Sequence, residues 1–562
     1  MTAAQIDAEV DGVPVLLAPA PGPLRAGLMF RVGVADETAA TVGVTHLVEH
    51  LALHRLGVAD YHYNGLTTAT TTQFVTQGSP EAVVSFLHGV CAGLRALPVD
   101  RLPVERKLIG SEEAGRGGAA NLSMPFWRHG ARDYGLISLP PYGIHTLGAE
   151  QVAEWAATRF TRGNAVLWLT GTDVPAGLRL ELPDGPRHPL PAASSALPLQ
   201  PAAFPGGASV LVLDALVPRT AAATVYTRAL ERALFRELRQ ERGLSYTTAT
   251  DYSTDGRPTA VVTAVADTRD GDEAAVVEHF AAQLRRLRDT DLDPGELDAV
   301  RALALEAVRD PEADARTLPR RATDLLCGFA GRTAAETTDE LERVTTADVR
   351  DVGRAVHGSA LLMLPRGVDM PPAGFEAAPQ LSRFSVTGRR FRSRVDPDVA
   401  LVHAADGVSL SAPPGPLTVL YADCVALLRW PDGARRLLGA DGVAVHIEPS
   451  FFPLPAQVTA AIEAAVPPGL VVDMPARDPD GIPRLSRITS LRSRVRRARV
   501  RLRARVDRSK LLGRGTGGVV TTMLLGLAGA VAVALAVDLR SWPALVAVAV
   551  LGVRFWPRRR SR

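Results

Sequence analysis

Two stretches rich in Pro and Ala interrupt this chain of 562 residues, at 182–207 and at 365–379. Such stretches lack the regular apolar spacing of helices and strands, and they usually connect folded units. We therefore expect three folded blocks, at 1–182, 205–365 and 380–473. A chain of this length is also too long for a single hydrophobic core, which favours several domains over one.

The first two blocks share one pattern. Apolar runs typical of strands, such as LMFRVGV and ASVLVLDALV, alternate with amphipathic helical stretches such as 220–242 and 294–308. This alternation predicts an α+β fold with two tandem α+β domains. The third block has short apolar runs separated by Asp-Gly turns and ends with a helix near 456–465. It predicts a small β-rich domain that resembles a pleckstrin-homology barrel.

The sequence changes character after the third block. Residues 484–514 carry 13 Arg or Lys and a single acid, with apolar residues at every third or fourth position. This pattern predicts an Arg-rich amphipathic helix, which either lies on anionic membrane lipid or forms a charged stalk before the membrane. Residues 515–537 are uncharged, and as a helix they would be about 34 Å long, enough to span a bilayer of roughly 30 Å. A shorter apolar stretch follows, so we expect one or two transmembrane helices within 515–556.

Arginine lies on both sides of this apolar region, up to Arg514 and again from Arg558. Because Arg-rich flanks stay in the cytoplasm, we expect a transmembrane hairpin with the folded blocks and the C-terminal tail on the cytoplasmic side. The N-terminus carries acids where a secretory signal would carry basic residues. These features predict an integral protein of the cell membrane whose folded blocks lie in the cytoplasm.

Composition excludes several classes of protein. Hydrophobic residues make up 46% and charged residues 22%, which excludes wholesale disorder. The formal net charge of +3 is too small for a whole-chain nucleic-acid binder, so no nucleic-acid partner is expected. Cys91, Cys327 and Cys424 are far apart and form no C-x-x-C pair. Their spacing argues against a disulfide framework and against a cysteine-based zinc site.

The segment THLVEHLALH carries the strongest chemical signal, because His46, Glu49 and His50 form the pattern H-x-x-E-H. On a helix, positions i, i+3 and i+4 lie on one face, so two neutral imidazoles one turn apart can bind one metal ion. The carboxylate between them can then accept a proton from water at the metal. This arrangement is typical of a peptidase, although two surface histidines on a helix would give the same pattern.

The chain resembles the pitrilysin and insulinase family of inverzincin zinc metallopeptidases, to which the mitochondrial processing peptidases are similar. The segment VERKLIGSEE resembles the family's E-R-x-V-I-x-S-E segment. This resemblance implies that Glu112 is the third zinc ligand. It also implies that Glu105, two helical turns earlier, supports the site by orienting a ligand or the water. For Glu113 we prefer the simpler interpretation of an exposed helix with several acids.

The segment NGLT, which begins at Asn64, resembles the family's N-A-x-T strand. The resemblance implies that Asn64 hydrogen-bonds the substrate backbone or the surroundings of the metal, although Asn-Gly alone equally suggests a β-turn. Gly65 departs from the family's Ala and leaves open how a substrate pairs with this edge strand. PPYGIHTLG and FTRGNAVLWLTG resemble later segments of the same domain.

In the second block, LFRELRQERGLSY resembles the family's R-E-K-x-G-L-x-Y element and contains Arg239 and Tyr246. In relatives this pair faces the metal from another domain, which implies that Arg239 holds a peptide carbonyl and that Tyr246 donates to the developing oxyanion. The residues alone suggest a solvated helix arginine and a core or strand aromatic. Larger relatives carry four such domains and this chain has two. We therefore expect a homodimer, or a related pitrilysin-like partner, that shares its sites between chains.

These patterns together predict a membrane-anchored zinc endopeptidase that hydrolyses short or unstructured peptides. His46, His50 and Glu112 would hold the zinc, and Glu49 would be the general base and then the proton donor. Two alternatives remain open. One is a non-catalytic scaffold or partner subunit with the same fold. The other is a protein whose main role is membrane targeting through the Arg-rich helix and the β-rich domain, with the peptidase serving one dedicated partner.

Overall fold

The computed structural model describes residues 6–57, 62–115, 123–480 and 482–483. The predicted Arg-rich helix and the predicted transmembrane helices, at 484–514 and 515–556, therefore lie outside the described residues. Within the described part, no single helix is long and apolar enough to cross a membrane. Two successive helices reach such a length and composition only together, and they are bent by 80° at their junction.

The first unit is a six-stranded sheet with helices packed on one face. Its strand order is β1-β2-β6-β3-β5-β4, and every neighbouring pair is antiparallel except β2 with β6. The strands are β1 (Ala8–Val10), β2 (Val13–Leu17), β3 (Leu24–Phe30), β4 (Tyr63–Thr67), β5 (Thr72–Gly78) and β6 (Ala165–Leu169). The helices are α1 (Val44–Leu53), α2 (Pro80–Arg95), α3 (Leu102–Gly115) and α5 (Ala149–Arg159). Their apolar faces form one buried core with the sheet.

The second unit repeats this arrangement. Its strand order is β12-β7-β11-β8-β10-β9. The pair β7 with β11 is parallel, like β2 with β6, and the edge strand β12 also pairs in parallel with β7, whereas β1 is antiparallel to β2. The pairs from β11 to β9 are antiparallel. The strands are β7 (Ala202–Pro205), β8 (Val210–Pro218), β9 (Thr248–Ser253), β10 (Thr259–Asp267), β11 (Leu361–Leu364) and β12 (Glu376–Ala377). The helices are α6 (Ala221–Leu234), α7 (Glu273–Asp289), α8 (Pro294–Arg309), α10 (Ala334–Arg343) and α11 (Thr346–Ser359).

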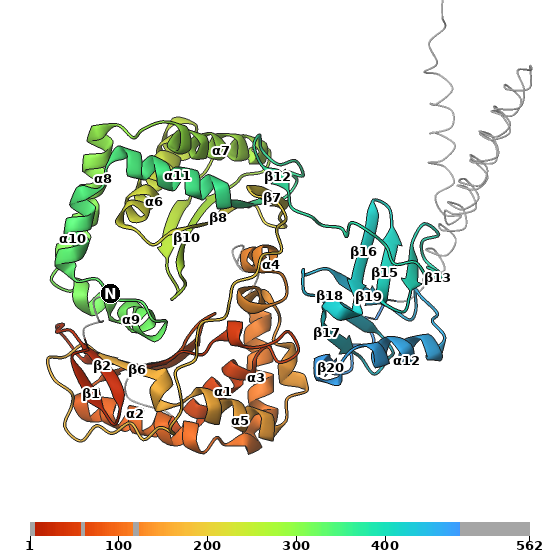
Figure 1. Ribbon diagram of the computed structural model, residues 1–562, viewed down its shortest axis with the longest axis horizontal. Coiled ribbons are helices and arrows are strands. Elements are labelled where there is room, and N and C mark those ends of the chain that lie inside the picture. Colours follow the sequence, from red (N-terminus) through yellow and green to blue (C-terminus); the bar gives the residue numbers. More distant parts are fainter. Residues whose placement is uncertain (1–5, 58–61, 116–122, 481, 484–562) are drawn as a thin grey trace, which may run out of the picture.

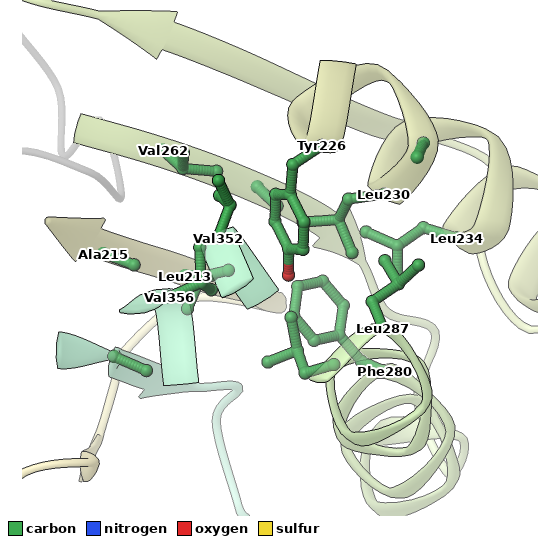
Figure 2. Packing of buried hydrophobic residues seen from close by; sticks show 14 of the residues in the cluster. Leu213, Ala215, Tyr226, Leu230, Leu234, Val262, Phe280, Leu287, Val352 and Val356 are labelled. Atoms are coloured by element: carbon green, nitrogen blue, oxygen red, sulfur yellow. The ribbon is translucent and has the colours of Figure 1, made fainter. Parts of the chain in front are cut away.

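The core of the second unit lies between its sheet and the helices α6, α7, α8, α10 and α11. Figure 2 shows Tyr226 and Leu230 from α6 packed against Phe280 from α7, with Val352 from α11 nearby. The helix expected over 220–242 is present as α6 and continues as a π-helical stretch, Phe235–Glu241. Such stretches are rare and often occur at functional sites.

The two units exchange helices across their interface. Helix α9 (Ala313–Leu326) belongs to the second unit, yet its buried face packs on the open face of the first sheet (Figure 1). Helix α4 (Met124–His129) does the converse and packs on the second sheet. Arg128 of α4 is buried and donates from Nε to Asp214 Oδ1 at 2.7 Å in β8. Each sheet is therefore covered on one face by a helix of the other unit, and the two units share these packed surfaces.

The third unit contains two four-stranded sheets that share one core with a helix. One sheet has the order β13-β14-β15-β16 and the other β19-β18-β17-β20. The elements are β13 (Arg389–Arg392), β14 (Ala400–His403), β15 (Gly407–Ala412), β16 (Gly415–Leu420), β17 (Cys424–Arg429), β18 (Arg435–Gly439), β19 (Ala444–Ile447), α12 (Ala456–Ala465) and β20 (Val471–Asp473). The last strand follows the helix and pairs in parallel with β17. This unit lies beside the first one, where Leu428 and Leu438 pack against Leu136 and Tyr142 (Figure 1).

The two Pro-rich breaks contribute to the second sheet. Strand β7 lies in the first break and β12 in the second, so this unit extends from residue 202 to 377. The intervening segment before β7 is held by Arg31, which is fully buried and donates to the carbonyl oxygens of His188 and Pro189. A buried guanidinium needs such acceptors, so this connection is a fixed part of the structure.

Candidate metal centre

Helix α1 carries the H-x-x-E-H pattern and is fixed at both its apolar face and its N-terminus. Its residues Val44, Leu47, Val48 and Leu51 are buried in the first core at helical spacing. The helix begins after Gly43, which has a φ of 103° and offers no side chain as a cap. Glycine tolerates this left-handed conformation without strain. The missing cap comes from elsewhere in the chain.

That cap is Glu37, a buried carboxyl group. Its two oxygens accept hydrogen bonds from the backbone N–H groups of Gly43 and Thr45, each at 2.8 Å. These groups are among the unpaired donors of a helix N-terminus, where a carboxylate is favourable. Burial nevertheless raises the pKa of Glu37 to about 7, against the opposing effect of the hydrogen bonds. The start of the metal-motif helix thus depends on one buried acid.

The predicted metal ligands converge on one point. His46 Nε2 and His50 Nε2 are 3.1 Å apart. One oxygen of Glu112, on α3, lies 3.5 Å from His46 Nε2, and the other lies 3.5 Å from His50 Nε2. A tetrahedral zinc ion with bonds of about 2.0–2.1 Å places its ligand atoms about 3.3 Å apart. The donor set of two imidazoles and one carboxylate therefore fits zinc in both chemistry and spacing.

Glu105 supports the same cluster from α3. Its carboxylate is buried, and Oε2 lies 3.3 Å from Nδ1 of His50. Its other oxygen lies 3.6 Å from the guanidinium of Arg101 and 4.0 Å from Nδ1 of His54. A carboxylate on the far nitrogen of a ligating imidazole fixes the tautomer and the ring orientation. The resemblance implies such a supporting role for Glu105, and its carboxylate lies at hydrogen-bonding distance from His50.

Glu49 lies close to both imidazoles but differs from Glu112 in its contacts. Ligand atoms of His46, Glu49 and His50 all lie within 4.8 Å of one another. The carboxylate of Glu49 is buried, and its Oε2 accepts a hydrogen bond from Thr67 Oγ1 at 2.6 Å. Glu112 is half exposed and directs one oxygen at each imidazole. This division suits a ligand role for Glu112 and a proton-accepting role for Glu49.

These groups line one cavity of about 790 Å³. Its volume falls in the range of ligand-binding clefts, roughly 300–1,000 Å³. Asn64, Leu66 and Leu108 also line it, and the two leucines are 48% and 47% exposed. Asn64 lies within strand β4 opposite Val75, so its interpretation as a β-turn was wrong. Because β4 ends the sheet, the cavity opens beside an edge strand.

Comparison with known proteins gives the fold. Residues 209–303 match the family described as "Peptidase M16 inactive domain". No curated protein matches the chain. A protease from Helicobacter pylori is 15% identical, with a TM-score of 0.52, over 64% of this chain and 98% of its own. A structure from Pseudomonas fluorescens, described as a peptidase M16 inactive domain, is 16% identical, with a TM-score of 0.52, over 66% and 99%. This chain has the fold of M16 peptidases.

A third comparison gives the same fold. The first half of the periplasmic protease PqqL from Escherichia coli has a TM-score of 0.52 at 14% identity, over 65% of this chain and 94% of that half. The expected pitrilysin-like α+β fold is thereby confirmed. The match to the inactive domain lies wholly in the second unit, whereas the H-x-x-E-H pattern lies in the first. That match therefore says nothing about the chemistry of α1.

Arg239 and Tyr246 are brought together, but away from the cavity. The guanidinium of Arg239 lies 4.7 Å from the ring centre of Tyr246, and Tyr246 is 74% exposed. The described residues that line the cavity all fall between 34 and 141, in the first unit. The structure thus places the two residues in contact with each other, and neither lines the cavity of its own chain.

Three contacts of the site were missed from the sequence. The NGLT motif contains Thr67 without indicating a role for it, and the sequence patterns above point to neither Glu37 nor His54. Glu37 lies before α1 in the chain and Thr67 lies after it. Contacts of this kind between different segments cannot be predicted from the spacing of residues within a helix. His54 comes four residues after His50, and this spacing was the available signal for it.

Proposed function

We propose that the chain is a zinc-dependent endopeptidase. The observation that carries this proposal is the convergence of His46, His50 and Glu112 on one point of a cavity wall, with the buried carboxylate of Glu49 beside them. Zinc, when bound, polarises a peptide carbonyl and makes water more acidic. The three ligands carry one negative charge in total, which leaves the ion a net positive charge for that purpose.

Glu49 performs the proton transfers in this proposal. Its carboxylate accepts a proton from the attacking water and later gives a proton to the departing amine. Burial keeps bulk water away from the carboxylate, and Thr67 holds one of its oxygens. Glu105 keeps the imidazole of His50 oriented through its Nδ1. No other proton carrier is needed for hydrolysis.

The substrate in this proposal is a short or unstructured peptide. The cavity lies beside β4, whose outer edge is available for pairing with an extended backbone. Asn64 is exposed on this strand and offers an amide that can both donate and accept. A short or unfolded peptide can present its backbone in the extended form that such pairing needs. Unfolded peptides therefore fit the site best.

We further propose that the working unit is a dimer of this chain, or a pair with a related partner. Arg239 and Tyr246 form an exposed cation–π pair on the second unit, outside the cavity of their own chain. An exposed arginine and phenol on one surface can hold a carbonyl and donate to an oxyanion of a neighbouring site. The partner chain would supply that site.

The uncharged stretch at 515–537 supports membrane anchoring in this proposal, with the three folded units on the cytoplasmic side. Its test is topological. Protease added outside intact cells should leave a C-terminal tag after Arg562 intact, because both Arg-rich flanks stay inside. Removal of the tag from outside would favour a single span.

The proposed function is tested by zinc content and by hydrolysis measured together. The purified full chain should contain one zinc per chain by mass spectrometry and should cleave unstructured peptides. A chelator should abolish the cleavage, and added zinc should restore it. The alternative of a non-catalytic scaffold predicts neither zinc nor cleavage. A zinc-loaded chain without cleavage of any peptide, even with its partner supplied, would also refute a peptidase.

A further inference from the structure

Gly65 leaves a space that the carboxylate of Glu49 fills. A Cβ atom built on Gly65 would lie 2.4 Å from Glu49 Oε1 and 2.6 Å from Glu49 Cγ. Real Cβ contacts are not this short, so an alanine here would displace the glutamate side chain. Gly65 itself is buried on β4 and packs against the middle of α1. The departure from the expected alanine therefore has a local physical reason in this chain.

Thr67 lies on the same face of β4, because residues two apart in a strand point the same way. Its hydroxyl donates to Glu49 Oε2 at 2.6 Å. The neighbouring hydroxyl of Thr72 donates its single proton to the Val32 carbonyl oxygen at 2.8 Å. The proton of Thr67 is thus directed to the carboxylate. A hydroxyl bonded to an ionised acceptor forms one of the stronger hydrogen bonds in proteins.

We infer that Gly65 and Thr67 form a seat that fixes the Glu49 carboxylate beside the two imidazoles, and that Thr67 is a positioning residue for proton transfer. The inference rests on the proposed function for its effect on turnover. Gly65 supplies the space, and Thr67 supplies the hydrogen bond. A glutamate side chain has several rotamers of similar energy, so without the seat its carboxylate would spend much of its time elsewhere.

A purely structural role for Thr67 makes a different prediction. A buried carboxylate needs a donor, so loss of the hydroxyl would destabilise the fold without changing turnover of the folded enzyme. A positioning role predicts that turnover falls while substrate affinity and zinc content stay the same. Misplacement by about 1 Å can cost about a hundredfold in rate.

The first experiment compares Thr67→Val with Thr67→Ser in the full chain. Thr67→Val keeps the shape and removes the donor, so kcat should fall about tenfold or more with KM and zinc per chain unchanged. Thr67→Ser keeps the donor and should recover most of kcat. Gly65→Ala should lower kcat with zinc retained. Thr76→Val is the matched control, because its hydroxyl lies on β5 and contacts His62 O instead. Wild-type kcat in Thr67→Val would overturn the inference.

The second experiment does not depend on activity. Melting temperatures of the metal-free chain are compared for Thr67→Val, Glu49→Met and the double variant. Thr67→Val should lower the melting temperature in the wild-type chain but not in Glu49→Met, where the hydroxyl has lost its acceptor. If the changes in melting temperature of the two single variants add up in the double variant, the two side chains do not interact, and the proposed contact is wrong. If the wild-type chain cleaves no peptide, the proposed function fails while this cycle still tests the contact.

Discussion

The first and second units share the order and direction of five strands but differ in the helix that follows β3 in the first unit and β8 in the second. In the first unit, α1 presents two histidines and a buried glutamate to a cavity. In the second, α6 contains no histidine and only one acid, the exposed Glu231. Its inner face is filled by apolar side chains around Tyr226, as Figure 2 shows. A shared fold therefore does not fix function, which depends on a few side chains at particular positions.

The two helices also differ in how their N-termini are capped. Helix α6 is capped locally by its own Thr220, whose hydroxyl accepts from the Ala223 N–H. Helix α1 starts at a glycine and takes its cap from Glu37 instead. The first unit thus buries two carboxyl groups, Glu37 and Glu49, at this helix, where they are costly, whereas the one acid of α6 is exposed. Costly buried acids are a mark of functional sites.

The largest expected effect tests this contrast directly. Glu49→Gln should retain zinc but lose peptide hydrolysis by at least two to three orders of magnitude, about the contribution of a general base. Glu231→Gln, the matched change on α6, should leave the rate at the wild-type level. Rates are measured on an unstructured fluorogenic peptide, with zinc per chain measured in parallel. Full activity of Glu49→Gln would remove Glu49 from the base role.

The next effect separates the two acids of α3. Glu112→Gln should weaken zinc binding, because a neutral amide is a poorer ligand than a carboxylate. Glu105→Gln should weaken it less, by about 10–100-fold, since it acts through His50. Glu113→Gln is the control on the same helix. Zinc affinity is measured by competition with a chromogenic chelator. Equal affinities for wild type and Glu112→Gln would exclude Glu112 as a ligand.

The third effect concerns the surface of the second unit. A Glu49→Gln chain and a chain with Arg239→Ala and Tyr246→Phe should each be nearly inactive alone. After subunit exchange, about half of the dimers are mixed, and each mixed dimer has one complete site. Activity should therefore approach roughly a quarter of wild type by the symmetry of the dimer. Exchange without any recovery would show that the pair does not complete a site on a second copy of this chain.

The sequence predicts the metal helix well because its signal is local. The spacing of His46, Glu49 and His50 specifies one helix face, and the helices near 294–308 and 456–465 follow from the same periodicity. The exchange of α4 and α9 between units has no local signal, because an apolar helix face does not say which sheet it covers. The contact between Thr67 and Glu49 is similar, since it needs a strand placed beside a helix 18 residues away in the chain.

The fourth effect compares the acids that cap α1 and α11 by the pH dependence of stability. Folding raises the pKa of Glu37 to about 7 from an ordinary value of 4.5, chiefly by burial. This carboxyl therefore contributes stability that is fully present below about pH 4.5 and is lost as the pH rises to about 7. The linked change is up to about 3 kcal/mol. Urea unfolding at pH 5 and pH 7.5 should show this loss in the wild type and not in Glu37→Gln.

The matched cap in the second unit should behave in the opposite way. Asp348 caps α11 through Thr345, and these hydrogen bonds lower its pKa below 3.8. Its contribution is present above that pH and is lost on acidification through the lowered pKa. Asp348→Asn should therefore leave the difference between pH 5 and pH 7.5 as in the wild type. A pH dependence of Glu37→Gln equal to wild type would mean that Glu37 is ionised in the fold at pH 5.

The smallest effect compares two buried tyrosines. In the first unit, the hydroxyl of Tyr134 donates to the Pro191 carbonyl oxygen at 3.1 Å. In the second, the hydroxyl of Tyr226 is buried, and no described residue hydrogen-bonds it. Tyr134→Phe leaves a carbonyl unpaired and should cost about 0.5–1.5 kcal/mol. Tyr226→Phe removes a hydroxyl that gains nothing from burial, so unfolding in urea should show unchanged or slightly higher stability. If Tyr226→Phe destabilises the chain as much as Tyr134→Phe does, the hydroxyl must bond a buried water, and the core of the second unit is then less apolar than its side chains indicate.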